Sequence, residues 1–152
     1  LALLREAKKR HIHTTIETCG HYPTDVLDQA CRVLDALIFD IKCLDSARHK
    51  KATGVGSELI LKNIGHVFEH FPELPVLIRT PVIPGFNDTE EDILGIREMI
   101  PRKANIRYEA LTYHRMGQPK YGYLGRRYEL EGVKADEAFM KRLNIMLKSY
   151  EK

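Results

Sequence analysis

Residues 76–88 read V-L-I-R-T-P-V-I-P-G-F-N-D, and residues 36–42 read A-L-I-F-D-I-K. Each segment is an apolar run with polar residues at its carboxyl end. Two further segments, residues 11–20 and 105–114, have the same form and end in E-T-C-G and T-Y-H. In parallel α/β proteins the carboxyl ends of the strands carry the binding and catalytic side chains. We therefore expect these four strand ends to form one wall of an active site.

Helical patterns of apolar residues lie between the four apolar runs. We predict strands at residues 12–16, 36–41, 76–82 and 106–111, and helices at residues 24–34, 57–71, 89–100 and 135–150. This alternation predicts a parallel sheet with right-handed crossovers. Residues 1–152 are thus expected to form one α/β domain, either a partial (β/α) barrel of about four strands or a small doubly wound sheet. Ser57 and Thr89 are predicted helix N-caps, and Pro81 predicts that strand pairing stops near Thr80.

The composition is that of a globular protein, with 43% hydrophobic and 30% charged residues. A net charge of +3 is too balanced to indicate nucleic acid, and the basic runs at residues 8–10 and 48–51 are expected to be solvated surface. No apolar run approaches the roughly 20 residues of a membrane span. Three scattered cysteines, Cys19, Cys31 and Cys43, fit free thiols in a reducing cytoplasm. The chain begins without methionine, in a helical pattern, so we expect it to continue a larger protein.

Five residues at the strand ends could carry chemistry. Asp40 and Lys42 are two apart and should share a face of the sheet, where they could hold a ribose hydroxyl, an amine or a carboxylate, or only an ion pair. Arg79 lies in an apolar strand, so it should face the pocket or meet an acid. Glu17 and Thr18, with Asp40, could give oxygen ligands to a hard cation. The alternative is that Glu17 pairs with Lys42 or Arg79.

Two motifs are weaker indications of function. The run H-V-F-E-H at residues 66–70 matches the zinc motif H-x-x-E-H, but it is expected on the solvent face of a helix. The run T-G-V-G-S at residues 53–57 precedes a helix and could cradle a phosphate. It lacks the lysine of a P-loop, so a turn followed by a cap is the simpler interpretation. Residues 115–134 form a long irregular segment, which is expected to be either functional or a packing strap.

Five collinear segments identify a resemblance: I-E-T-C-G, F-D-I-K, H-K-K-A-T-G-V, I-R-T-P-V-I-P-G-F-N-D and Y-H-x-x-G-x-x-K-Y-x-x-L-G. Together they resemble the glycyl-radical-enzyme activating proteins, most closely those that activate pyruvate formate-lyase. These are radical S-adenosylmethionine (SAM) proteins with a partial (β/α)6 barrel. The chain lacks the C-x-x-x-C-x-x-C motif that binds the [4Fe–4S] cluster and the Gly-Gly-Glu strand end. It therefore resembles the C-terminal portion of a radical SAM core, strands three to six.

The resemblance implies positions for the cofactor and a cation. Glu17 and Thr18 would surround a monovalent cation together with Asp40, with glutamate in place of the usual aspartate. No acid–base catalyst is implied, because the cluster and cofactor supply the chemistry. The residues implied to line the SAM pocket are Asp40, Lys42, Arg79 and His114.

The implied activity is reductive cleavage of SAM, which installs a glycyl radical on a partner such as pyruvate formate-lyase. The implied electron donor is a flavodoxin or ferredoxin, in a cytoplasmic protein of anaerobic metabolism. Because the cluster motif is absent, the isolated chain is expected to bind no cluster and to be inactive. The alternative is a non-catalytic half-barrel that binds a nucleotide or a protein partner.

A half-barrel would also leave one side of its sheet open. The first strand becomes an unpaired edge, and inward apolar side chains lose their cover. Several hundred Å² of bared apolar surface at ~25 cal/mol per Å² is a penalty on the order of 10 kcal/mol. We therefore predict self-association, most simply as a two-fold dimer. The side chains expected on the open side include Ile38, Ile41, Val76, Ile78 and Leu111.

Overall fold

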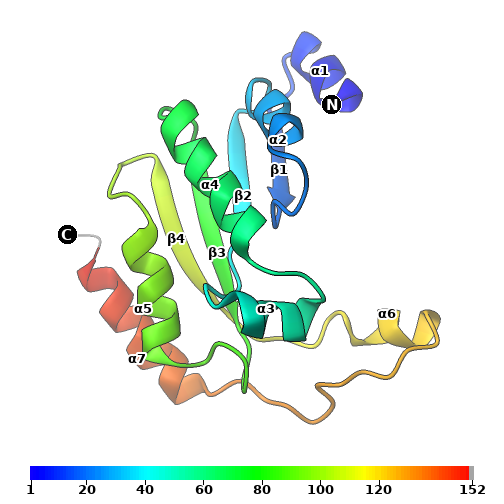
Figure 1. Ribbon diagram of the computed structural model, residues 1–152, viewed down its shortest axis with the longest axis vertical. Helices are drawn as coiled ribbons and strands as arrows, with labels where there is room; N and C mark the ends of the chain where they lie inside the picture. The colour runs from blue at the N-terminus through cyan, green and yellow to red at the C-terminus, as the bar shows by residue number, and fades with distance from the viewer. Residues whose placement is uncertain (151–152) are drawn as a thin grey trace.

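The computed structural model describes residues 1–150 and contains one parallel sheet with strand order β1-β2-β3-β4. The strands are β1 (Thr15–Thr18), β2 (Ala36–Asp40), β3 (Val76–Val82) and β4 (Ile106–Thr112). The helices are α1 (Ala2–Lys9), α2 (Thr24–Cys31), α3 (Ser46–Thr53), α4 (Glu58–His70), α5 (Glu90–Met99), α6 (Gln118–Tyr123) and α7 (Glu137–Ser149). The predicted four-stranded parallel α/β fold is confirmed (Figure 1). In residues 1–150, no helix has the length and apolar character needed to cross a membrane.

Helices cover one face of the sheet and leave the other face open. In β2, Leu37 and Phe39 are fully buried under the helices, whereas Ala36, Ile38 and Asp40 are partly exposed. The same alternation runs through β3 (Val76–Val82), whose even-numbered residues are buried. Because side chains alternate between the faces of a strand, this arrangement puts Asp40 and Arg79 together on the open face.

The prediction of which apolar side chains lie on the open face was partly wrong. Ile41, Val76 and Ile78 are at most 3% exposed, and they belong to the core between sheet and helices. Of the five predicted side chains, only Ile38 and Leu111 are on the open face, and both are half-buried. The apolar area without cover is therefore smaller than the sequence suggested. The prediction of self-association stays untested.

Strand pairing does not stop near Thr80. It continues through Pro81↔Leu111 to Val82↔Thr112. The main-chain oxygen of Arg79 accepts from the Ile41 amide, so odd-numbered residues of β3 direct their polar groups toward β2. The backbone nitrogen of Pro81 therefore points toward β2, which has already ended at Asp40. Because no strand residue stands opposite it there, the absence of an N–H in proline removes no hydrogen bond from the sheet.

Short or polar elements differ most from the predictions. α3 and α6 were not predicted, because neither carries a long apolar stripe; only His49 is buried in α3. β1 begins three residues later than expected. Arg48 is not simply solvated, since it pairs with Asp92 and donates to the Phe86 carbonyl at 3.2 Å.

The two predicted N-caps behave differently. Thr89 caps α5, and its hydroxyl accepts from the Asp92 amide at 3.1 Å. Ser57 occupies the N-cap position of α4 but makes no capping bond. Its hydroxyl instead donates to the Leu44 carbonyl at 2.9 Å, which ties the start of α4 to the loop after β2.

Candidate functional site

Four charged side chains meet on the open face, at the carboxyl ends of β1, β2 and β3. Arg79 makes a two-pronged contact with Glu17, with Nη2–Oε1 and Nη1–Oε2 distances of 2.9 and 3.2 Å. Its Nε lies 3.9 Å from Asp40 Oδ1. On the other side, Lys42 Nζ lies 3.3 Å from Asp40 Oδ2. The register that pairs Asp40 with Arg79 across β2 and β3 sets up this arrangement.

Two atoms in this cluster lack a hydrogen-bond partner. Asp40 Oδ1 and Arg79 Nε are both buried and unbonded among the described residues. Buried polar groups are normally satisfied, and an unsatisfied one costs stability. The free carboxylate oxygen can accept from a hydroxyl or an amine, and the arginine N–H can donate to an oxygen. This is the donor and acceptor set that a nucleoside or an amino acid requires.

The geometry shows which basic side chain Glu17 meets. Glu17 pairs with Arg79 and not with Lys42, within the described residues. Thr18 is paired with Phe39, so its side chain lies on the helix side of the sheet. The Thr18 hydroxyl accepts from the Gly20 amide at 3.0 Å. Within residues 1–150, no group of three or more histidine, cysteine or acidic residues could hold a metal, so the cation site remains a prediction.

Two buried polar residues support the site from behind, and the sequence reasoning missed their role. Thr80 Oγ1 donates to the Ile41 carbonyl at 2.7 Å. Asn87 Nδ2 donates to the carbonyls of Lys42 and Pro81 at 2.7 and 2.9 Å, and Asn87 Oδ1 accepts from the Ile83 amide at 2.7 Å. These bonds fasten the segment that carries Asp40 and Lys42 to the exit of β3. The available signal was a threonine and an asparagine that are polar yet lie within an apolar motif.

The loop after β1 is held in a similar way. Asn63 of α4 is fully buried and donates to the carbonyls of Gly20 and Tyr22 at 2.6 and 2.8 Å. Gly20 has φ +68°, and a Cβ there would lie 2.2 Å from the Phe39 ring. Only glycine fits this position. The end of the E-T-C-G segment is thereby packed against β2.

His114 lies apart from the charged cluster. It is exposed, directly after β4, and lines a cavity of about 410 Å³ together with Tyr113, Lys134 and Glu137. No hydrogen bond or ion pair joins it to Asp40, Lys42 or Arg79 in the described structure. It shares with them only the carboxyl end of the sheet. The structure thus brings three of the four predicted SAM-pocket residues together.

The H-x-x-E-H motif is structural. The prediction that His66 lies on the solvent face was wrong. Its Nε2 lies 3.2 Å from Asp28 Oδ1 at the contact between α4 and α2. His66 also stacks on His70 with ring centroids 4.1 Å apart. Glu69 has 79% of its side chain exposed. The His66 and Arg32 contacts lower the pKa of Asp28, the Arg32 hydrogen bond having the larger effect.

The glycine-containing turn before α4 does not suit a phosphate. The Glu58 carboxylate occupies the space beside Gly56, where it accepts from the Ser46 hydroxyl. The Ser57 amide donates to Ser46 Oγ at 3.2 Å. An acid and an occupied amide both oppose a phosphate. The Ser46 hydrogen bond also lowers the pKa of Glu58.

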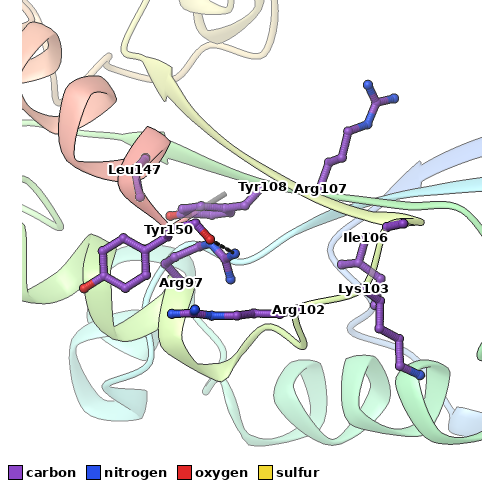
Figure 2. A pocket seen from close by; sticks show the side chains of 9 residues that line it. Arg97, Arg102, Lys103, Ile106, Arg107, Tyr108, Leu147 and Tyr150 are labelled. Carbon is purple, nitrogen blue, oxygen red and sulfur yellow. Dashed lines mark hydrogen bonds between the residues drawn. The ribbon is translucent and has the colours of Figure 1, made fainter. Parts of the chain in front are cut away.

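A second cavity, of about 460 Å³, lies at the opposite end of β4. Figure 2 shows Arg97 and Arg102 beside Tyr150, whereas Lys103 and Arg107 extend away from them. The Arg97 and Arg102 guanidinium carbons lie 5.9 and 5.8 Å from the Tyr150 ring centroid. Arg97 also donates to the Tyr150 carbonyl at 3.3 Å. Since the four positive charges do not converge, this cavity is not a focused anion site.

The three cysteines do not form a cluster site in the described structure. All are free; Cys19 is exposed, and Cys31 and Cys43 are buried. Burial raises the pKa of Cys31 to about 11, so its thiol is neutral at physiological pH, and the described residues contain no group of three or more histidine, cysteine or acidic side chains that could hold a metal. An iron–sulfur cluster does not fit the residues of this chain.

The amino-acid sequence is similar to those of known activating enzymes. No family model matches the chain. It is 99% identical over 152 residues to the (2S)-3-sulfopropanediol sulfolyase activating enzyme of Bilophila wadsworthia, covering all of this chain and 50% of that protein. It is 46% identical over 147 residues to the isethionate sulfite-lyase activating enzyme of Nitratidesulfovibrio vulgaris, covering 97% of this chain and 48% of that protein.

A solved structure supports the same relationship. A domain of the pyruvate-formate lyase-activating enzyme of Bacteroides vulgatus matches with a TM-score of 0.73 and 25% identity, over 98% of this chain and 83% of that one. The chain spans about half the length of the curated relatives it matches. By sequence and by fold, the chain is homologous to part of the glycyl-radical-enzyme activating enzymes.

Proposed function

We propose that residues 1–152 are one domain, the C-terminal part of a radical SAM activase. The activase installs a glycyl radical on (2S)-3-sulfopropanediol sulfolyase, the enzyme named in the relative that is 99% identical. The observation that carries the proposal is the cluster of Asp40, Lys42 and Arg79 at adjacent strand ends, with a carboxylate oxygen and an arginine N–H left unbonded. That set of groups fits the polar parts of SAM.

The chain's residues would bind and orient the cofactor. Asp40 Oδ1 would accept a hydrogen bond from a ribose hydroxyl or from the methionyl amine of SAM. Lys42 and Arg79 would donate charge-assisted hydrogen bonds to the methionyl carboxylate. When bound, SAM and a [4Fe–4S] cluster held outside this chain supply the reductive chemistry that removes a hydrogen atom from a glycine. His114 would approach the cofactor from the end of β4. Glu17 fixes Arg79 through two hydrogen bonds, so it acts as a positioning residue.

The surroundings of the activase belong to the same proposal. It would receive electrons from a flavodoxin or ferredoxin and work in the cytoplasm. A cation beside Glu17 and Asp40 would lie close to the Arg79 charge, so it would need the main-chain oxygens of the strand ends, such as that of Thr18, as further ligands. Without the cluster, the isolated chain would form no glycyl radical.

The experiment compares the full-length activase with its Asp40→Asn variant under anaerobic conditions. Release of 5′-deoxyadenosine from SAM reports cofactor cleavage, and calorimetry reports SAM affinity. Asp40→Asn should weaken SAM binding about 10-fold or more, as expected for one lost charge-assisted hydrogen bond. Asp88→Asn, an exposed acid on the loop before α5, is the matched control and should bind SAM as the wild type does.

Two results would contradict the proposal. One is a full-length reading frame without C-x-x-x-C-x-x-C upstream of this chain. The other is unchanged SAM affinity in Asp40→Asn. A stable [4Fe–4S] absorbance after anaerobic reconstitution of the isolated chain would refute the predicted inactivity of the chain alone.

A further inference from the structure

The segment of residues 115–134, here called the arm, leaves the body of the protein. It begins after β4 and contains α6 (Gln118–Tyr123). Figure 1 shows α6 at the tip of a long loop that extends beyond the carboxyl ends of the strands. α6 has no buried residue. The arm thus extends from the carboxyl end of the sheet, where the candidate site lies, and α6 does not pack on the core.

The arm exposes large apolar side chains close together in sequence. Met116 is 75% exposed, Tyr123 87% and Leu124 68%. These are large values for side chains of this size in a folded domain. Tyrosine, methionine and arginine are the residue types enriched at protein–protein interfaces. Such a surface is typical of a site that a protein partner covers.

The arm also carries a concentrated positive charge. It contains five basic residues and two acidic ones, a net charge of +3, which equals the net charge of the entire chain. None of the five makes an ion pair within residues 1–150. Their charge is therefore available to an acidic partner. The basic residues are Arg115, Lys120, Arg126, Arg127 and Lys134.

Tyrosine contacts join α6 to the returning part of the arm and tie the arm to the end of β4. The hydroxyls of Tyr113 and Tyr128 lie 2.5 Å apart. The ring of Tyr121 packs edge-on against Tyr128 with centroids 5.0 Å apart, and the Arg126 amide donates to the Tyr121 carbonyl at 2.8 Å. Because Tyr113 directly precedes His114, these contacts hold the arm beside the strand ends. A protein bound to the arm would therefore lie at the carboxyl end of the sheet, the end that also carries the candidate site.

We propose that the arm is the docking surface for the glycyl-radical enzyme, and that it recognises an acidic surface with exposed apolar side chains on that partner. This proposal rests on the proposed function. Charge complementarity would act mainly on the association rate and on specificity. The apolar side chains of Tyr123 and Leu124 would supply the desolvated contact.

The experiment uses the full-length activase and purified (2S)-3-sulfopropanediol sulfolyase. The double variant Arg126→Glu/Arg127→Glu reverses two arm charges that make no ion pair in the described structure. The control Lys51→Glu/Lys141→Glu reverses two exposed charges on α3 and α7. The rate of glycyl radical formation, followed by electron paramagnetic resonance, gives the KM for the sulfolyase. Release of 5′-deoxyadenosine without the sulfolyase reports the SAM site alone.

The arm reversal should raise the KM for the sulfolyase about 10-fold, with weaker salt dependence. SAM cleavage without the sulfolyase should stay unchanged, and the control should behave as the wild type. Tyr123→Ser/Leu124→Ser should raise the same KM without changing its salt dependence.

An unchanged KM in both arm variants, with normal SAM cleavage, would overturn the docking proposal while leaving the proposed function standing. The docking proposal would also be overturned if the arm reversal abolished binding to anionic phosphatidylserine vesicles and left the KM unchanged. Absence of SAM cleavage in the wild type would instead contradict the proposed function.

Discussion

Asn87→Ala should destabilise the chain through the loss of three hydrogen bonds at one buried side chain. Asn87 is 0% exposed. Its amide bonds to the carbonyls of Lys42 and Pro81 and to the Ile83 amide, at distances of 2.7 to 2.9 Å. Alanine removes all three bonds and leaves the main-chain groups to find other partners. At about 1 kcal/mol for each bond, the expected loss is about 3 kcal/mol of unfolding free energy.

Urea unfolding followed by circular dichroism measures this loss. Asn144→Ala is the matched control, because Asn144 is exposed on α7 and alanine favours a helix; its effect should stay within about 0.5 kcal/mol. Asn87→Asp should lower the unfolding free energy by at least as much as Asn87→Ala, since a carboxylate would face two carbonyl oxygens. A loss below about 1 kcal/mol in Asn87→Ala would show that the hydrogen bonds do not hold the two loops together.

Three further predictions concern the helix cap, alkaline pH and association. Thr89→Ala should cost about 1 kcal/mol in urea unfolding through loss of the α5 cap; no change would argue against the cap. Burial raises the pKa of Tyr108 from 10.0 to about 12. Its neutral phenol therefore contributes stability that is present below pH 10 and lost as the pH rises toward 12, and Tyr108→Phe should flatten that part of the pH–stability curve. Light scattering at tens of micromolar should show self-association through the open face around Ile38 and Leu111, and a clean monomer of 17.5 kDa would contradict it.

The general architecture could be predicted because it depends on local patterns. The apolar runs and the helical periodicities between them indicated four strands in a parallel sheet, and all four strands are present. β3 has the predicted bounds, Val76–Val82. α3 and α6 escaped prediction because short polar helices have no apolar stripe to reveal them. The spacing of Asp40 and Lys42 also predicted correctly that both side chains lie on one side of the sheet. In the structure, Lys42 Nζ lies 3.3 Å from Asp40 Oδ2.

The sequence could not say which face of each strand the helices cover. Strand periodicity is two, so it separates two sets of side chains without naming the buried one. In a strand as apolar as β3, both sets look suited to the core. This ambiguity explains why Ile41, Val76 and Ile78 were expected on the open face. Glu17 and Thr18 are adjacent in β1, so the same periodicity places their side chains on opposite faces of the sheet.

By itself, the sequence determined the order of strands and helices, the strand ends that carry polar groups, and the family resemblance through collinear motifs. Only the tertiary structure decided that Arg79 links Glu17 to Asp40, since that contact depends on the register of three strands. It also decided that Asn87 holds the Lys42 loop from 45 residues away. Local patterns report the nearest neighbours in the chain, whereas hydrogen bonds between distant loops exist only after the sheet has assembled.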